Sequence, residues 1–281
     1  MRLRLICSLT LAGMAFAQQS PRIYNTVKTK LAEGKQVVGG TVSSYDPEVY
    51  CAMANAGFDY TWIEMQHSTL TYTQVANMIR FCKGASAMPF IRVPDATEGD
   101  IQKAMDLGAT GIIIPMVDTV EKVQNAVKFA NYPPKGVRSQ GGGQYGAMWG
   151  NDYRQISNDN LVIVAMIENP KGVAIADQIA AVPGVDVVFI ASTDLGSFSG
   201  YKQGEPQYEA LVDQIKAAVL GKGLKLGGPH AWQSSRKDYT FFQGAGETQL
   251  VRMGAQVALK AGTMTSSAPR GVAPIEGAEK H

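Results

Sequence analysis

Eight short apolar segments recur along the chain, and stretches with helical periodicity separate each from the next. Short apolar runs predict strands buried on both faces, and longer segments with apolar residues three or four apart predict amphipathic helices. A regular alternation of the two is typical of parallel βαβ units. The expected strands span residues 37–43, 60–66, 88–94, 111–117, 162–168, 185–192, 224–229 and 248–253.

Eight such units, preceded by a candidate helix over 22–33, predict an α/β fold of the (β/α)8 TIM-barrel class with parallel strands. The first expected strand is not followed by the Gly-x-Gly-x-x-Gly pattern of dinucleotide-binding sheets, which favours a closed barrel. An open doubly wound sheet remains the alternative. The length of 281 residues with 45% hydrophobic content fits one large domain rather than two small ones.

The first 17 residues have the pattern of an export signal. Arg2 and Arg4 precede an apolar run over 5–14, and Ala15-Phe16-Ala17 matches a small-x-small cleavage site. We therefore expect a signal peptide over 1–17, a barrel domain over 18–262 and a flexible C-terminal tail over 263–281. We also expect export to the periplasm or secretion, and no membrane-spanning helix in the mature protein.

Cysteine content and charge limit the remaining classes. Cys51 and Cys82 lie on expected helices, where cysteines are more often small buried hydrophobes than bridged, although an oxidising compartment would permit a disulfide. The formal net charge is +2, and no basic stripe is interleaved with aromatic residues. Nucleic acid is therefore not an expected partner.

One long connection, over residues 132–160, differs in composition from the others. It contains Pro133-Pro134, three glycines over 141–143 and the aromatic residues Tyr145, Trp149 and Tyr153. Connections of this length inside a compact domain are usually functional or disordered. The composition favours a lid or a subunit contact, and an unstructured surface insertion is the alternative.

Polar side chains gather where the expected strands end, which is where the active sites of such barrels lie. Charged groups on otherwise apolar strands are costly unless they are paired or bind a metal. The residues concerned are Glu64, Gln66 and His67 on strand two, Arg92 on strand three, Glu168 on strand five and Ser192, Thr193 and Asp194 after strand six.

Glu168 and Asp194 follow consecutive strands, so the two carboxylates could meet at one edge of the barrel. Two hard oxygen ligands on rigid elements suit Mg²⁺ or Mn²⁺, with Co²⁺ a further candidate. The alternative is that Glu168 pairs with a neighbouring basic residue and that Asp194 caps the next helix. Spacing alone does not decide between the two.

Two basic side chains have plausible roles nearby. The guanidinium of Arg92 could clamp a carboxylate or an enolate oxygen, or it could form a barrel salt bridge with Glu64 or Glu168. His67 is a candidate proton carrier, although a lone histidine at a strand end is more often only hydrogen-bonded. His230, after strand seven, is a weaker candidate for a substrate contact, with helix capping favoured.

Other reaction classes are disfavoured by missing motifs. The sequence contains no Gly-x-Ser-x-Gly, no Walker loop and no His-Glu-x-x-His. Lys225 is the only lysine that an expected strand could direct into the barrel, which disfavours a lysine Schiff base.

In order and at barrel spacing, these residues resemble the HpcH/HpaI aldolase/citrate lyase family, whose simpler members are 4-hydroxy-2-oxo acid aldolases. The likeness covers nearly the whole mature domain. It is carried by Ala56-Gly57-Phe58-Asp59-Tyr60, Ile63-Glu64-Met65-Gln66-His67, Pro89-Phe90-Ile91-Arg92-Val93-Pro94, Asp106-Leu107-Gly108-Ala109, Ile114-Pro115-Met116-Val117, the segment Tyr132 to Arg138, Ile167-Glu168 and the segment Pro183 to Leu195.

The resemblance implies a metal-dependent class II aldolase that joins a pyruvate-type 2-oxo acid to an aldehyde, or cleaves the product, through an enolate. It implies Glu168 and Asp194 as metal ligands, Arg92 as the clamp, His67 as the acid/base and Asp106 as its support across a subunit boundary. We accordingly expect a homo-oligomer, trimer or hexamer. The full set expected is His67, Arg92, Asp106 and Glu64 as catalytic residues, and Arg92, Ser192, Thr193 and Gln66 as substrate contacts.

The chain departs from the family pattern at several positions. Glu64 and Gln66 stand where aspartate and glutamate are usual, Met166 replaces a common glutamine, and Ser192-Thr193 replaces Gly-Pro. These departures concern substrate selection and the proton path more than metal binding. Two alternatives stay open: another enolate reaction, on a thioester or phosphoenolpyruvate-type substrate, and a non-catalytic organic-acid or sugar-binding protein outside the cytoplasm.

Overall fold

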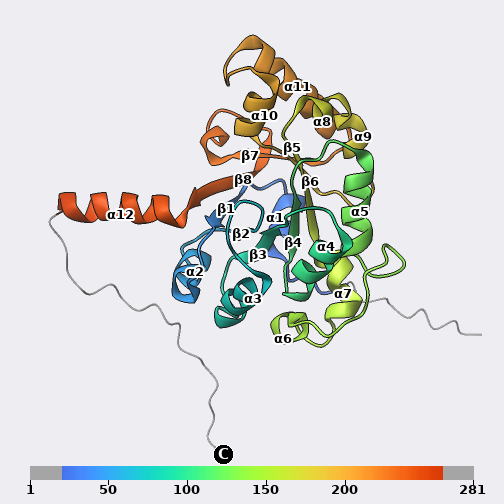
Figure 1. Ribbon diagram of the computed structural model, residues 1–281, viewed down its shortest axis with the longest axis vertical. Helices are drawn as coiled ribbons and strands as arrows, with labels where there is room; N and C mark the ends of the chain where they lie inside the picture. Colours follow the sequence, from blue (N-terminus) through green and yellow to red (C-terminus); the bar gives the residue numbers. More distant parts are fainter. Residues whose placement is uncertain (1–20, 262–281) are drawn as a thin grey trace, which may run out of the picture.

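The structure, a computed structural model, describes residues 21–261, and within them eight parallel strands close into a barrel in the order of the sequence (Figure 1). This confirms the predicted (β/α)8 class. The predicted signal peptide and C-terminal tail lie outside the described residues. The strands are β1 Val37–Val42, β2 Tyr60–Glu64, β3 Met88–Arg92, β4 Gly111–Ile114, β5 Val162–Ile167, β6 Val187–Ile190, β7 Lys225–Pro229 and β8 Tyr239–Gly246.

Helices surround the barrel, and none in the described part of the chain is long and apolar enough to cross a bilayer. Thr71, Thr97 and Thr119 cap three of them through side-chain oxygens that accept backbone N–H groups. The helices are α1 Thr26–Ala32, α2 Pro47–Ala54, α3 Tyr72–Phe81, α4 Glu98–Asp106, α5 Val120–Ala130, α6 Tyr145–Trp149, α7 Tyr153–Asn160, α8 Pro170–Ala174, α9 Ala176–Ala180, α10 Ser192–Ser199, α11 Pro206–Gly221 and α12 Glu247–Ala261, with a 3-10 turn, η1, at His230–Trp232.

The interior of the barrel is filled by side chains rather than open. Tyr60, Trp62, Phe90, Phe189 and Phe241 form a buried aromatic cluster inside the strands, separate from the aliphatic layer between strands and helices. Because side chains alternate along a strand, the residue two positions after an inward-facing aromatic also faces inward. The strand period therefore directs the polar residues that end β2 and β3 toward the mouth of the barrel.

The last strand is not where the sequence pattern placed it. Residues 248–253, predicted as strand eight, lie in α12, and β8 is the preceding segment Tyr239–Gly246. The connection from β7 to β8 holds only the short turn η1, so the strand begins earlier than a full helical connection would allow. Glycines near the end of β8 weaken its apolar signal. In Figure 1, α12 projects away from the barrel, and Val251, Val257 and Leu259 on it are exposed.

The expectation of two unbridged cysteines is also wrong. Cys51 on α2 and Cys82 at the C-terminal end of α3 form a disulfide, with Cα atoms 5.3 Å apart. The two helices follow consecutive strands and pack side by side, which brings their facing positions together. The bridge closes a loop of 31 residues on the outside of the barrel.

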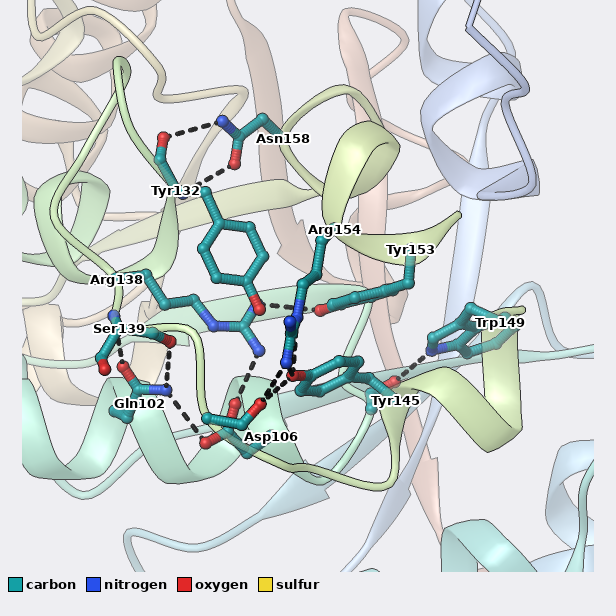
Figure 2. Close-up of polar contacts among 12 residues, drawn as sticks. Gln102, Asp106, Tyr132, Arg138, Ser139, Tyr145, Trp149, Tyr153, Arg154 and Asn158 are labelled. Carbon is teal, nitrogen blue, oxygen red and sulfur yellow. Dashed lines mark hydrogen bonds and ion pairs between the residues drawn. The ribbon is translucent and has the colours of Figure 1, made fainter. Parts of the chain in front are cut away.

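The connection over 132–160 is folded around a buried arginine (Figure 2). The side chain of Arg138 is inaccessible to solvent, and its Cζ lies 4.5, 5.3 and 5.5 Å from the ring centroids of Tyr132, Tyr145 and Tyr153. Its Nη2 donates to Oδ1 of Asp106 at 2.8 Å. The segment is therefore packed, which contradicts the alternative of an unstructured insertion.

The position of this connection argues against a lid on its own barrel. Trp149 donates to the carbonyl of Gly108, just before β4 begins, and stacks on Tyr24 in the N-terminal segment. Helix α7 ends immediately before β5 begins. The connection thus covers the amino ends of the strands, whereas the polar residues of the predicted active site lie at the carboxyl ends. Its second predicted role, a subunit contact, stays a prediction.

Candidate active site

Glu64 and Arg92 form a buried ion pair at the carboxyl ends of β2 and β3. Nε of Arg92 donates to Oε2 of Glu64 at 2.6 Å, and the side chains are 9% and 7% exposed. The pair was one of the alternatives that the sequence left open for Arg92. The two side chains meet because Glu64 and Arg92 are register partners in the parallel ladder of β2 and β3.

Glu64 is held by three further donors. Oε2 also accepts from Nε1 of Trp62 at 3.2 Å, and Oε1 accepts from the backbone amides of Gln66 and His67 at 2.8 and 3.0 Å. Four donors to one carboxylate fix its orientation and use most of the acceptor capacity of its two oxygens. The geometry gives Glu64 a positioning role toward Arg92 and toward the loop that carries His67.

Arg92 keeps donor capacity facing the barrel interior. Its guanidinium lies 5.8 Å from the ring of Trp62, and Nη1 is 3.9 Å from the sulfur of Met166, which is only a weak acceptor. A buried cation with one carboxylate partner and a thioether neighbour can accept an additional anionic ligand. This arrangement is suited to binding a small carboxylate.

Glu168 and Asp194 meet next to this pair. Glu168 directly follows β5 and is 1% exposed, and Asp194 lies in the first turn of α10 within hydrogen-bonding reach of it. Burial, together with the neighbouring Asp194, raises the pKa of Glu168 to about 7, opposed by a hydrogen bond from the amide of Met116. No basic residue within the described range forms a salt bridge with Glu168, and Asp194 does not cap α10.

This donor set fits a hard divalent cation. Two carboxylates on consecutive strands repel one another unless a proton or a cation lies between them. Mg²⁺ is commonly held by one or two carboxylates, with water and substrate oxygens completing the coordination. Within residues 21–261 no group of three or more His, Cys, Asp or Glu side chains could hold a metal, so a two-carboxylate site is the candidate.

The remaining predicted residues lie in different places. Gln66 and His67 follow Glu64 in the same loop; the side chain of His67 is exposed, and Oε1 of Gln66 is buried without a partner. Ser192, at the start of α10, accepts a hydrogen bond from Gln203, and Thr193 is exposed beside it. All four residues are at the carboxyl ends of the strands.

Two predicted residues are not brought to this group. Asp106 ends α4 and is held by Arg138 and Gln102 (Figure 2). The end of α4 lies at the amino ends of the strands, so Asp106 cannot reach His67 of its own barrel. His230 is exposed and hydrogen-bonds to Gln233. The predicted role of Asp106 as the support of His67 therefore requires a second subunit.

Two residues near the mouth of the barrel escaped the sequence reading. Met116, after β4, donates its backbone amide to Glu168, and side-chain patterns contain no signal for this contact. Glu247 is buried after β8 and accepts from the amides of Ser43 and Ser44. A correct assignment of β8 would have placed Glu247 with the other polar residues at strand ends.

A closed parallel barrel with ionisable side chains gathered at the carboxyl ends of its strands has the architecture of a TIM-barrel enzyme. Comparison with known proteins refines this class. Residues 42–227 match the model of the HpcH/HpaI aldolase/citrate lyase family. The chain belongs to this family and is a carbon–carbon lyase.

Individual relatives agree with this placement. A hydroxypyruvate/pyruvate aldolase from Rhizorhabdus wittichii is 35% identical over 196 residues, covering 70% of this chain and 75% of that protein. A 4-hydroxy-2-oxovalerate aldolase from Rhodococcus jostii is 32% identical over 209 residues, covering 72% and 78%. The crystal structure of an HpcH/HpaI aldolase/citrate lyase family protein from Burkholderia cenocepacia has a TM-score of 0.76 at 25% identity, covering 85% of this chain and all of that one.

Proposed function

We propose that the protein is a class II aldolase that forms or cleaves a carbon–carbon bond between a pyruvate-type 2-oxo acid and an aldehyde. The observation that carries the proposal is the meeting of Glu168 and Asp194 beside the buried guanidinium of Arg92. A paired acidic site beside a buried cation is suited to a substrate that carries both a carboxylate and an adjacent oxo group. Relatives named for pyruvate and hydroxy-oxo acid aldolases support it.

Glu168 and Asp194 are the residues that would hold the divalent cation, Mg²⁺ or Mn²⁺. When bound, such a cation acts as a Lewis acid that stabilises negative charge developing on the 2-oxo oxygen of the substrate. Burial of Glu168 strengthens this binding, because a desolvated carboxylate gains more from a nearby cation than a solvated one does.

Arg92 binds the acid end of the substrate in this proposal. Nε is engaged by Glu64, which fixes the plane of the guanidinium and leaves its Nη groups for a carboxylate or an enolate oxygen. Pre-orientation of the donors means that little reorganisation is required when charge develops. Phe189 and Trp62 line the barrel below and limit access of water.

His67 moves the proton in this proposal. It lies at the end of the loop that follows β2, with its backbone amide fixed by Glu64 and its ring exposed at the carboxyl end of the barrel. An imidazole side chain can act as a general acid or base and exchange protons with solvent. When the bond forms, the methyl carbon of the 2-oxo acid loses a proton and the aldehyde oxygen gains one, and cleavage reverses both transfers.

The direct test is an assay of the purified protein with pyruvate, glycolaldehyde and Mn²⁺ or Mg²⁺. We expect a 4-hydroxy-2-oxo acid product that disappears when the metal is chelated and in Glu168→Gln. Stabilisation by pyruvate with no product in any metal would instead identify a binding protein. Product formation that resists chelation would contradict the proposed class.

We also propose that the protein is exported and forms a homo-oligomer, trimer or hexamer. The Cys51–Cys82 disulfide and the signal-like first 17 residues support an oxidising compartment. The exposed Val251, Val257 and Leu259 on the projecting helix α12 support burial against another copy. Light scattering of the mature protein tests the assembly, and a monomer would contradict it.

A further inference from the structure

Met116 has a backbone conformation that is rare for its residue type. Its φ is 51°, and it is the one non-glycine residue with positive φ in the part of the chain that the structure describes. Side chains with a Cβ are disfavoured in this left-handed region by steric contact with the backbone. Met116 is neither glycine nor asparagine, so the surrounding structure must impose the conformation.

In this conformation the backbone amides of Met116 and Val117 both donate hydrogen bonds at the end of β5. The N–H of Met116 donates to Oε1 of Glu168 at 2.6 Å, and the N–H of Val117 donates to the carbonyl of Met166 at 3.0 Å. The carbonyl of Val117 in turn packs against Gly172, where an added Cβ would lie 2.4 Å from it. Three contacts therefore fix the path of the chain after β4 against the start of α8.

Strained backbone that the fold over-determines is concentrated at functional sites. Here the strained residue contacts one oxygen of one carboxylate. Oε1 of Glu168 accepts the amide of Met116, so Oε2 is the oxygen with more acceptor capacity left for another partner. The carboxylate is also fixed in rotation, because a short hydrogen bond to a rigid amide restricts its terminal torsion.

We propose that the left-handed peptide of Met116 is a positioning element that presents Glu168 to the divalent cation through a single oxygen, Oε2. This inference rests on the proposed function. The side chain of Met116 is not part of the device, and the residue acts only through its backbone N–H. This positioning role would explain why a methionine holds a conformation that is unfavourable for its residue type.

The test compares three variants by their tolerance of positive φ. Met116→Gly accepts the conformation, Met116→Ala keeps most of its cost and Met116→Val disfavours it most strongly because of β-branching. A backbone role predicts that the glycine and alanine variants bind Mn²⁺ as the wild type does, since alanine and methionine have a similar cost in this conformation, and that the valine variant binds about tenfold more weakly. A side-chain role predicts weaker binding than wild type by both the glycine and the alanine variant, because each removes the thioether side chain.

The measurement is Mn²⁺ binding by electron paramagnetic resonance, with folding checked by circular dichroism. Thermal unfolding of the metal-free variants is the second readout, and Met116→Gly is expected to melt above Met116→Ala. If Met116→Val does not fold, comparison of the glycine and alanine variants with the wild type still distinguishes a backbone role from a side-chain role. Weaker binding by the glycine or alanine variant than by the wild type, or binding by a folded valine variant equal to that of the wild type, overturns the inference. Failure of the wild type to bind Mn²⁺ overturns the proposed function as well, which separates the two outcomes.

Discussion

Glu64 and Arg92 face one another as register partners at the ends of β2 and β3, with 2.6 Å between Oε2 and Nε. The ladder itself sets this separation, so the pair does not depend on a flexible loop. A charge pair on rigid strands can hold the guanidinium in one orientation before any substrate arrives. Pre-organisation of this kind lowers the cost of binding and of charge development.

Glu64→Gln is expected to weaken pyruvate binding and to lower activity by at least tenfold. The change leaves Arg92 as a buried cation without its anionic partner, which costs on the order of 3 kcal/mol of stability. The measurements are pyruvate affinity by calorimetry and the free energy of unfolding in urea. Pyruvate affinity equal to that of wild type would show that Glu64 does not position the clamp.

Glu247→Gln is the matched control for that prediction. Glu247 is also buried and also accepts two backbone amides, but it lies after β8 and has no arginine partner in the described structure. We expect it to lose stability while pyruvate affinity stays within about twofold of wild type, because its backbone contacts lie outside the clamp.

Glu168 gives the metal-free protein a characteristic pH dependence. Its pKa is about 7 in the fold against an ordinary value of 4.5, so the folded state binds a proton that the unfolded state has lost. The stability from this group is complete below about pH 4.5 and is lost as the pH rises through 7, by about 3 kcal/mol in all. Urea unfolding with a chelator present, at pH 5 and pH 8, measures it.

In Glu168→Gln this loss between pH 5 and pH 8 is expected to disappear, since the amide does not titrate. An identical pH dependence in the variant and the wild type would mean that another group is responsible. Addition of Mn²⁺ should stabilise the wild type more at pH 8 than at pH 5, because cation and proton compete for the same carboxylates.

The disulfide is expected to stabilise the barrel through its outer helices. Replacing Cys51 and Cys82 by alanine opens a loop of 31 residues, which costs about 3–4 kcal/mol in the chain-entropy treatment. Thermal unfolding of the double variant against wild type checks this. Treatment of wild type with a reductant should lower its melting temperature toward that of the variant, whereas an unchanged temperature in both cases would contradict a stabilising bridge.

The strand pattern predicted the barrel well because parallel strands buried on both faces leave uninterrupted apolar runs, as in Val162–Ile167. It failed at β8, where glycines and an abbreviated connection remove both the apolar run and the helix before it. The cysteine pairing was missed because it depends on the tertiary contact between α2 and α3. Periodicity within each helix does not say which positions of two helices face each other.

The candidate site could also be predicted only in part from the sequence. Polar residues at strand ends could be collected from the sequence because the barrel sends all carboxyl ends to one face. The four hydrogen bonds to Glu64 could not be predicted from the sequence, since two of the donors are backbone amides of its own loop. The strained amide of Met116 was hidden because it is also a backbone contact. Asp106 lies at the other end of the barrel because α4 runs antiparallel to the strands and Asp106 is its last residue.

Whether Glu168 and Asp194 hold a divalent cation is best decided by anomalous diffraction from crystals grown with Mn²⁺ and pyruvate. We expect one anomalous peak between the two carboxylates, with Oε2 of Glu168 as ligand and pyruvate reaching from the ion to Arg92. Crystals in which the two side chains share only a proton, with manganese elsewhere or absent, would contradict it.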